Sequence, residues 1–156
     1  MNSYSELVEN RRLDHLRLAQ VALELYGLLE TGASAQLISD AEHAIFKVSV
    51  PSGMGVVAHP YLGRIDGMQF LLRIEDTIET RMATTYSELA LLATMLRDTD
   101  LALPEPVPAM DGALVPELYT GMEIDDEDPK QCVLFRWAGL PFPEAALSYA
   151  GHWQDN

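Results

Sequence analysis

The middle of the chain combines a short apolar run with a longer helical pattern. Residues 69–74 are mostly apolar, which is typical of a strand with little solvent exposure. Residues 81–98 are rich in Leu, Met and Ala, which favour helix formation. We therefore expect a buried strand that is followed, after a short loop, by a long helix.

The helical pattern places a carboxylate on an apolar face. At about 100° per residue, the apolar side chains that share one broad arc are Met82, Leu89, Leu91, Leu92, Met95 and Leu96. Glu88 falls near the middle of this arc. Burying a carboxylate is costly unless a cation meets it, and Arg73 in the preceding strand is the nearest candidate. We predict an Arg73–Glu88 ion pair between the strand and the helix that crosses it.

The remaining pattern predicts an α+β fold. Residues 13–26 form a second helical pattern, which ends at Gly27. Runs of strand-like composition occupy residues 35–39, 44–50 and 131–137. Together with residues 69–74 and the helices over 13–26 and 81–98, these runs predict a domain of the α+β class.

Three segments between these elements are irregular. Residues 51–66 contain several Gly and Pro residues and predict a loop between strands, with His59 at the surface. Alternate prolines within residues 100–108 exclude a central strand and indicate an extended edge segment. The residues that follow, 110–112, are typical of a hairpin turn that pairs the strands on either side of it.

Composition and charge narrow the function classes. The 156 residues are 48% apolar and carry a formal net charge of −14, which is typical of one soluble domain. The largest cluster of basic residues is the dipeptide Arg11-Arg12, so we exclude general nucleic-acid binding. The chain has neither a run of about 18 apolar residues nor a signal-peptide pattern, so we expect no membrane segment. A single cysteine, Cys132, excludes an internal disulfide and fits the cytoplasm.

No pattern predicts a catalytic residue or a metal site. Cys132 lies in an apolar run without His or Asn partners, so we interpret it as a buried small side chain rather than a nucleophile. The acidic run at 123–128 lacks the central glycine and the distal glutamate of a calcium loop. We interpret that run as a solvated turn.

Several short segments in succession are similar to one protein family. The segments are residues 22–28, 39–48, 70–74, 87–92, 103–108, 111–112 and 132–139. In their order and spacing over residues 13–140, they resemble the N-terminal lobe of the aminoglycoside phosphotransferase/choline kinase-like family, and most closely its homoserine-kinase-type members. The resemblance implies a protein-kinase-like N-lobe, an antiparallel sheet of about five strands that is crossed by the helix over 81–98 and flanked by the helix over 13–26. For the family, it implies ATP-dependent phosphorylation of a small hydroxyl compound, with ATP and Mg²⁺ as cofactors.

The resemblance also implies nucleotide-binding roles for individual residues. Arg73 takes the place of the strand lysine of a kinase N-lobe and would contact the α- and β-phosphates, while Glu88 holds it. Phe135 would lie at the back of the adenine pocket. Arg136 and Ala138 would offer backbone groups to the base.

In the family, the turn at residues 39–43 is the loop that covers the nucleotide phosphates, which would involve Glu42 and His43. Such loops cradle phosphates with closely approaching backbone N–H groups and usually contain glycine. This loop has no glycine, and Asp40 and Glu42 carry negative charge. An ordinary hairpin turn and a nucleotide-covering loop are both compatible with these residues. We expect at most weak nucleotide binding.

The resemblance divides the chain into three parts. Residues 1–12 are polar and are expected to be a flexible lead-in, residues 13–140 form the kinase-like lobe, and residues 141–156 are a hinge or linker remnant. The family's His-x-Asp-x-x-x-x-Asn-like loop and its later metal-binding Asp belong to a C-lobe, which this sequence lacks. We therefore expect the chain to be catalytically inactive by itself.

Two alternatives remain open. The first is a non-catalytic module that binds a partner or a second copy, in which Trp137, Phe142 and Trp153 leave an apolar patch that favours association. On this reading we predict a homodimer, in place of the contact with a C-lobe. The second is an unrelated α+β domain, in which the Arg73–Glu88 pair has a structural role alone.

Overall fold

The computed structural model describes residues 3–39, 43–52, 58–76, 79–100, 103–118 and 130–136 of the chain. Its central element is a six-stranded antiparallel sheet in the order β1-β2-β5-β8-β6, in which β7 also pairs with β8. The strands are β1 (Ser34–Ser39), β2 (Ala44–Ser49), β5 (Gln69–Asp76), β6 (Glu105–Val107), β7 (Glu117–Leu118) and β8 (Lys130–Arg136). The sheet and its helices confirm the predicted α+β class.

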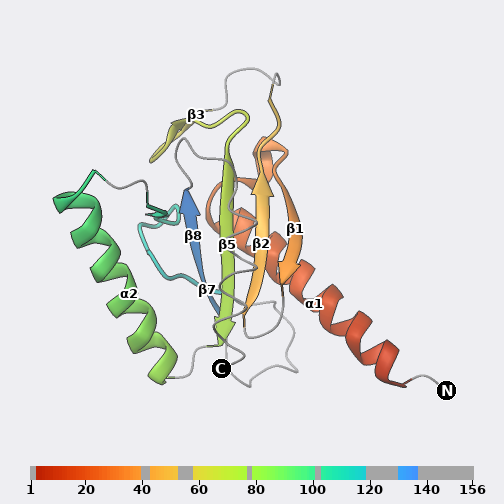
Figure 1. Cartoon of the computed structure of the whole chain (residues 1–156). Coiled ribbons are helices and arrows are strands. Elements are labelled where there is room, and N and C mark those ends of the chain that lie inside the picture. Colours follow the sequence, from red (N-terminus) through yellow and green to blue (C-terminus); the bar gives the residue numbers. More distant parts are fainter. Residues whose placement is uncertain are drawn as a thin grey trace.

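Two helices pack on opposite faces of this sheet (Figure 1). Helix α1 (Ser3–Leu25) crosses one face, and helix α2 (Glu79–Asp98) lies against the other. A short 3-10 helix, η1 (Leu29–Thr31), follows α1. Strands β3 (Ala58–His59) and β4 (Gly63–Arg64) form a separate two-stranded sheet. Within the described ranges, no helix is long and apolar enough to cross a membrane.

The larger core lies between α1 and the sheet. Its members on α1 recur at helical spacing and are Leu18, Ala19, Ala22, Leu23 and Tyr26. Its members on the central strands occupy alternate positions and are Phe46, Val48, Phe70, Leu72, Ile74, Cys132 and Leu134. Periods of about 3.6 and 2 residues are the two patterns that a sequence shows directly, so this half of the fold could be predicted.

Helix α1 begins earlier than the sequence pattern predicts. Residues 3–12, which we expected to be a lead-in to a helix over 13–26, are the first turns of α1. Leu7 is 66% exposed, so at this point the helix buries little against the body of the protein. Apolar periodicity reveals where a helix is buried rather than where it begins, which explains the difference.

The second, smaller core lies under α2. Leu89 of α2 is buried there against Leu71, Val133 and Phe135 of the sheet, and Leu92 packs against the same cluster. Leu91, which we placed on the same apolar arc, is instead 61% exposed. The buried stripe of α2 is therefore narrower than the arc predicted from the sequence.

The segment after α2 contains the predicted turn, but the predicted strand pairing is wrong. The N–H of Gly112 donates to the carbonyl of Ala109 at 2.8 Å, and Gly112 has a φ of 93°, so the chain does reverse there. The strands on either side do not pair with each other, because β6 and β7 both pair with β8. β6 contains Pro106 and lies at the edge of the sheet, as the alternate prolines predicted.

His59 is also placed differently from the prediction. We expected it on a surface loop, but it is only 5% exposed. Its Nε2 lies 2.7 Å from the carbonyl oxygen of Tyr26, and its Nδ1 accepts a hydrogen bond from the N–H of Tyr61 at 3.2 Å. Because Nδ1 is an acceptor, Nε2 carries the proton and donates it to Tyr26. His59 therefore joins the β3–β4 sheet to the end of α1.

Candidate functional site

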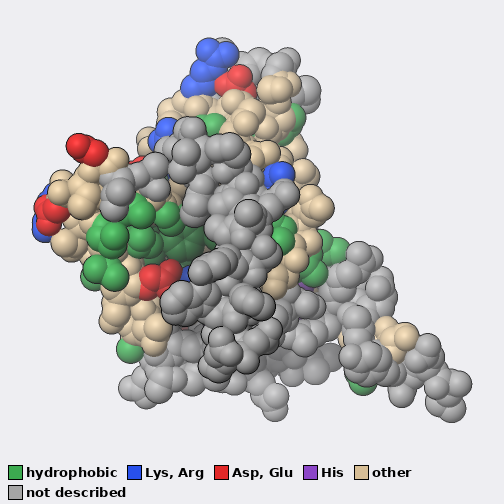
Figure 2. All heavy atoms as spheres, viewed as in Figure 1, with side chains coloured by type: hydrophobic (Ala, Val, Ile, Leu, Met, Phe, Trp, Pro, Cys, Tyr) green, Lys and Arg blue, Asp and Glu red, His purple; other side chains and the backbone are tan. Residues whose placement is uncertain are grey.

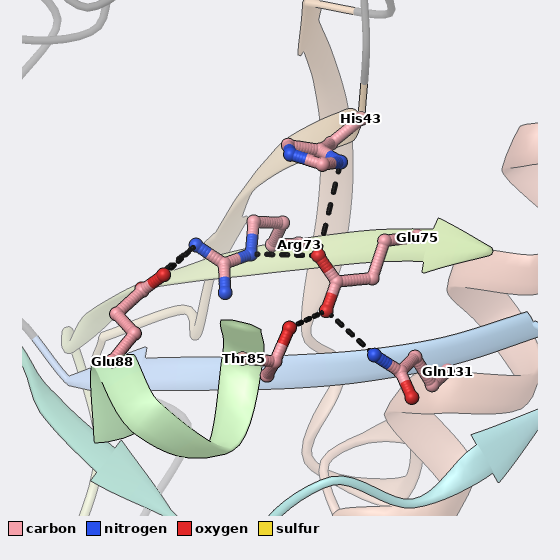
Figure 3. Close-up of polar contacts among 6 residues, drawn as sticks. All are labelled: His43, Arg73, Glu75, Thr85, Glu88 and Gln131. Atoms are coloured by element: carbon pink, nitrogen blue, oxygen red, sulfur yellow. Dashed lines mark hydrogen bonds and ion pairs between the residues drawn. The ribbon is translucent and has the colours of Figure 1, made fainter. Parts of the chain in front are cut away.

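The predicted ion pair between Arg73 and Glu88 is present (Figure 3). Nη1 of Arg73 donates to Oε1 of Glu88 at 2.9 Å and lies 3.3 Å from Oε2. Arg73 is in β5, where its neighbours across the sheet are Ile45 and Val133. The side chain of Arg73 is 15% exposed and that of Glu88 is 39% exposed. The pair therefore connects the centre of the sheet to the helix at a partly solvated position.

A second carboxylate, which the sequence analysis missed, lies beside Arg73. Glu75 is two positions further along β5, so it points to the same face of the sheet. Its side chain is 3% exposed, and its Oε2 lies 3.5 Å from Nε of Arg73, an ion pair without hydrogen-bond geometry. Oε1 of Glu75 accepts hydrogen bonds from the hydroxyl of Thr85 and, at 2.7 Å, from Nε2 of Gln131. Nδ1 of His43 lies 3.7 Å from Oε2 (Figure 3).

These contacts explain how a carboxylate can be buried here. Burying an ion costs several kcal/mol, and one opposite charge at about 4 Å returns only about 4 kcal/mol at an effective dielectric constant of about 20. Glu75 therefore needs its hydrogen bonds to Thr85 and Gln131 as well as Arg73. In the sequence, the available signal for Glu75 was its position two residues after Arg73, which places both side chains on one face of the strand.

The charges around Arg73 do not balance. One guanidinium faces the carboxylates of Glu75 and Glu88, and the imidazole of His43 adds a positive charge only when it is protonated. With His43 neutral, these side chains carry one excess negative charge. An anionic ligand at Arg73 would therefore need an additional cation beside it.

An apolar strip adjoins the guanidinium. The rows of residues across the strands place Leu71 beside Phe135 and Lys47, next to the row that contains Arg73. The guanidinium carbon of Arg73 lies 5.6 Å from the centre of the Phe135 ring, within the range of a cation–π contact. Figure 2 shows hydrophobic side chains gathered between α2 and the neighbouring part of the sheet. Leu71 and Phe135 are 8% and 3% exposed, so the guanidinium lies at the edge of a buried apolar cluster.

The other predicted site residues are only partly brought together. Phe135 lies on this face, and His43 reaches Glu75. Arg136 is in register with Phe70 of the larger core, so its side chain points to the opposite face of the sheet from Arg73. Its predicted backbone contact with the base stays a prediction. Glu42 and Ala138 lie outside the described residues, as do Trp137, Phe142 and Trp153.

The buried thiol matches its interpretation as a small core side chain. Cys132 is fully buried, its sulfur lies 3.8 Å from the hydroxyl oxygen of Tyr26, and burial raises its pKa to about 12. A thiol that stays protonated is a poor nucleophile. In the part of the chain that the structure describes, no group of three or more His, Cys, Asp or Glu is arranged to hold a metal ion.

Comparison with solved structures gives three matching chains, including the following two. The first is a microcompartment-associated aminopropanol kinase, which is 28% identical, with a TM-score of 0.55, over 81% of this chain and 32% of that chain. The second is amicoumacin kinase in complex with AMP-PNP, Ca²⁺ and Ami, which is 14% identical, with a TM-score of 0.48, over 67% of this chain and 26% of that chain. No protein-family model and no curated protein matches the chain.

The first match confirms the resemblance to small-molecule kinases that the sequence predicted. The antiparallel sheet with α1 and α2 is the arrangement of a kinase N-lobe. The chain spans about a third of the length of the aminopropanol kinase chain.

Proposed function

We propose that the chain provides the nucleotide-binding N-lobe of an ATP-dependent small-molecule phosphotransferase. The observation that carries this proposal is the Arg73–Glu88 pair, with its 2.9 Å hydrogen bond between the central strand and the helix. The pair occurs on a fold that is similar to an aminopropanol kinase. In kinases, the strand cation contacts the nucleotide phosphates, and the helix glutamate holds that cation in place.

The residues fit a nucleotide in two respects. The guanidinium of Arg73 has five N–H donors, so it can hold Glu88 through Nη1 and still donate to a phosphate oxygen. Leu71 and Phe135 are buried under α2, at 8% and 3% exposure, and give the guanidinium apolar surroundings, which a bound nucleotide base also requires. Phosphoryl transfer itself needs further groups that orient the acceptor hydroxyl, and none of the residues at this site fills that role.

The charge at the site predicts how the nucleotide binds. With His43 neutral, the carboxylates of Glu75 and Glu88 outweigh Arg73, so a bare triphosphate would be repelled. Mg²⁺ bound to the phosphates would supply the missing positive charge. We therefore expect Mg-ATP to bind weakly and ATP without a divalent ion to bind more weakly still.

The test is nucleotide binding by the purified chain. Chemical shift changes or calorimetry with Mg-ATP should show saturable binding in the millimolar range, which Arg73→Gln abolishes. Arg97→Gln is the matched control, because Arg97 is 73% exposed on α2 and forms an ion pair with its neighbour Asp98. Absence of binding by the unaltered chain at several millimolar Mg-ATP would overturn the proposal.

A second candidate function, self-association, is favoured by the outer face of α2. From residue 83 to 94, the exposed side chains carry no charge and are Ala83, Thr84, Tyr86, Ser87, Ala90, Leu91, Ala93 and Thr94. Outward faces of surface helices are usually charged, and this chain has a net charge of −14. Two such acidic chains would repel each other except through an uncharged face of this kind. We therefore propose a homodimer that is formed through α2.

A further inference from the structure

We propose that Glu75 is a positioning residue that fixes both Arg73 and helix α2. The inference deepens the proposed nucleotide site and rests on it only for the effect on phosphate binding. Its first test, on the helix itself, requires no nucleotide. The side chains involved are the six drawn in Figure 3.

Glu75 joins three elements through one carboxylate. Oε1 accepts from the hydroxyl of Thr85 on α2 and from Nε2 of Gln131 on β8, the latter at 2.7 Å. Oε2 faces Nε of Arg73 at 3.5 Å on the same strand. Strand β5, strand β8 and helix α2 therefore meet at a single side chain.

The Thr85–Glu75 contact lies next to the Arg73–Glu88 pair because of the residue spacing on the helix and on the strand. Thr85 and Glu88 are three residues apart and lie on one stripe of the helix. Arg73 and Glu75 are two residues apart and lie on one face of the strand. The helix therefore crosses the strand with two polar contacts side by side, Glu88 to Arg73 and Thr85 to Glu75.

The position of α2 depends strongly on these two contacts. Among the side chains of α2 that the structure describes, only Thr85 and Leu89 are buried, with 3% and 5% exposure. Leu92 is only partly buried against the same cluster, so the described side chains of the helix bury little apolar area against the sheet. Polar contacts that are shielded from water therefore contribute to holding it, and the contact of Thr85 with Glu75 is the more buried of the two.

The same carboxylate orients the guanidinium. Arg73 donates a hydrogen bond from Nη1 to Glu88, and its Nε faces Glu75 at 3.5 Å, so carboxylates attract the guanidinium from two sides. With Nε beside Glu75 and Nη1 on Glu88, we expect Nη2 to be the nitrogen that donates to a phosphate.

The first experiment measures hydrogen exchange of the α2 amides without nucleotide. Thr85→Val keeps the shape of the side chain but loses the hydroxyl, whereas Thr85→Ser keeps the hydroxyl. Thr94→Val is the matched control, because Thr94 is exposed and its hydroxyl donates to the Ala90 carbonyl of its own helix, at 3.0 Å. We expect the α2 amides of Thr85→Val to exchange about tenfold faster than those of the unaltered chain. The exchange rates of Thr85→Ser and Thr94→Val should stay within about twofold of the unaltered chain. Equal rates in Thr85→Val and Thr94→Val would overturn the proposal.

The second experiment separates positioning from general stability. Binding of Mg-ATP and of adenosine is measured for Glu75→Gln and for the two Thr85 variants. Glu75→Gln places an amide near Nε of Arg73, where two donors face each other. We expect the affinity for Mg-ATP to fall about tenfold while that for adenosine changes less than about twofold. Thr85→Val should lower the ratio of Mg-ATP affinity to adenosine affinity in the same way. Thr85→Ser should have the ratio of the unaltered chain.

Two outcomes count against the proposal in distinguishable ways. An equal loss of Mg-ATP and adenosine affinity in Glu75→Gln and Thr85→Val would show that Glu75 acts through stability and does not position Arg73. If the unaltered chain binds neither ligand, the proposed function is wrong, and with it the role of Glu75 toward phosphate. The exchange rates of the Thr85 variants then decide whether Glu75 holds α2.

Discussion

Arg73 and Glu88 are joined by a 2.9 Å hydrogen bond between the middle of the sheet and helix α2. Glu75 lies against the same guanidinium at 3.5 Å and is almost completely buried. Arg73 therefore neutralises a buried carboxylate and binds a half-exposed one. The two roles have different consequences when Arg73 is replaced.

Arg73→Gln should lower the free energy of unfolding by about 3 kcal/mol, because Glu75 is left buried without its cation. Arg73→Lys should cost less, since one ammonium group keeps the charge but cannot contact both carboxylates as a guanidinium does. Urea unfolding measures both values. Adding Glu75→Gln to Arg73→Gln should recover part of the loss, because the unpaired charge is gone. A double variant less stable than Arg73→Gln would contradict this account.

The Arg73–Glu88 pair could be predicted because both signals are local. A carboxylate on an apolar helical face requires a cation, and the preceding strand contains only one nearby. Glu75 could not be recognised in the same way. Its burial depends on Thr85, which is 10 residues away, and on Gln131, which is 56 residues away. In the sequence, Glu75 and Asp76 are two consecutive acidic residues after an apolar run, a pattern that is typical of a strand end exposed to solvent.

The fold was predictable to a similar extent. The two faces of the sheet follow from alternation in single strands, and α1 and α2 follow from their own periodicity. The pairing of β6 and β7 with β8 joins segments far apart in the sequence, and nothing in the turn at 110–112 specifies it. The burial of His59 likewise depends on Tyr26, which is 33 residues away.

His59 should contribute measurably to the stability of the fold. His59→Ala removes hydrogen bonds to Tyr26 and Tyr61 and leaves the Tyr26 carbonyl without this partner. We expect the free energy of unfolding to fall by about 1–3 kcal/mol, the cost of leaving a buried polar group unsatisfied. Tyr61→Phe is the control, since the hydroxyl that it removes makes only an exposed 3.4 Å contact. Similar losses in both variants would place His59 on the surface, as the sequence alone suggested.

The protein should lose stability in alkaline solution through Cys132 and Tyr26. Burial raises the pKa of Cys132 from 9.0 to about 12, and burial raises the pKa of Tyr26 well above its usual range. Above pH 9 the unfolded chain releases protons that the folded chain keeps, so stability is complete below pH 9 and declines as pH rises toward 12. Each group contributes a slope of at most about 1.4 kcal/mol per pH unit.

Urea unfolding between about pH 8 and pH 11 measures this decline, a range that spans the unperturbed thiol and phenol pKa values. Cys132→Ala should remove the part that begins near pH 9, and Tyr26→Phe the part that begins near pH 10. Tyr61→Phe serves as the control, because Tyr61 is 49% exposed. An unchanged slope in Cys132→Ala would show that the thiol is not protected from solvent.

Self-association through α2 should be sensitive to a single charge on its outer face. Leu91 is 61% exposed and lies among uncharged residues, so Leu91→Glu should leave folding unchanged while it places like charges opposite each other in a dimer. Light scattering should show a dimer for the unaltered chain and a monomer for Leu91→Glu. Leu29→Glu is the matched control, because Leu29 is also exposed, at 41%, but lies in η1, outside α2. A dimer that survives Leu91→Glu would place the interface elsewhere, and a monomeric unaltered chain at high concentration would exclude self-association.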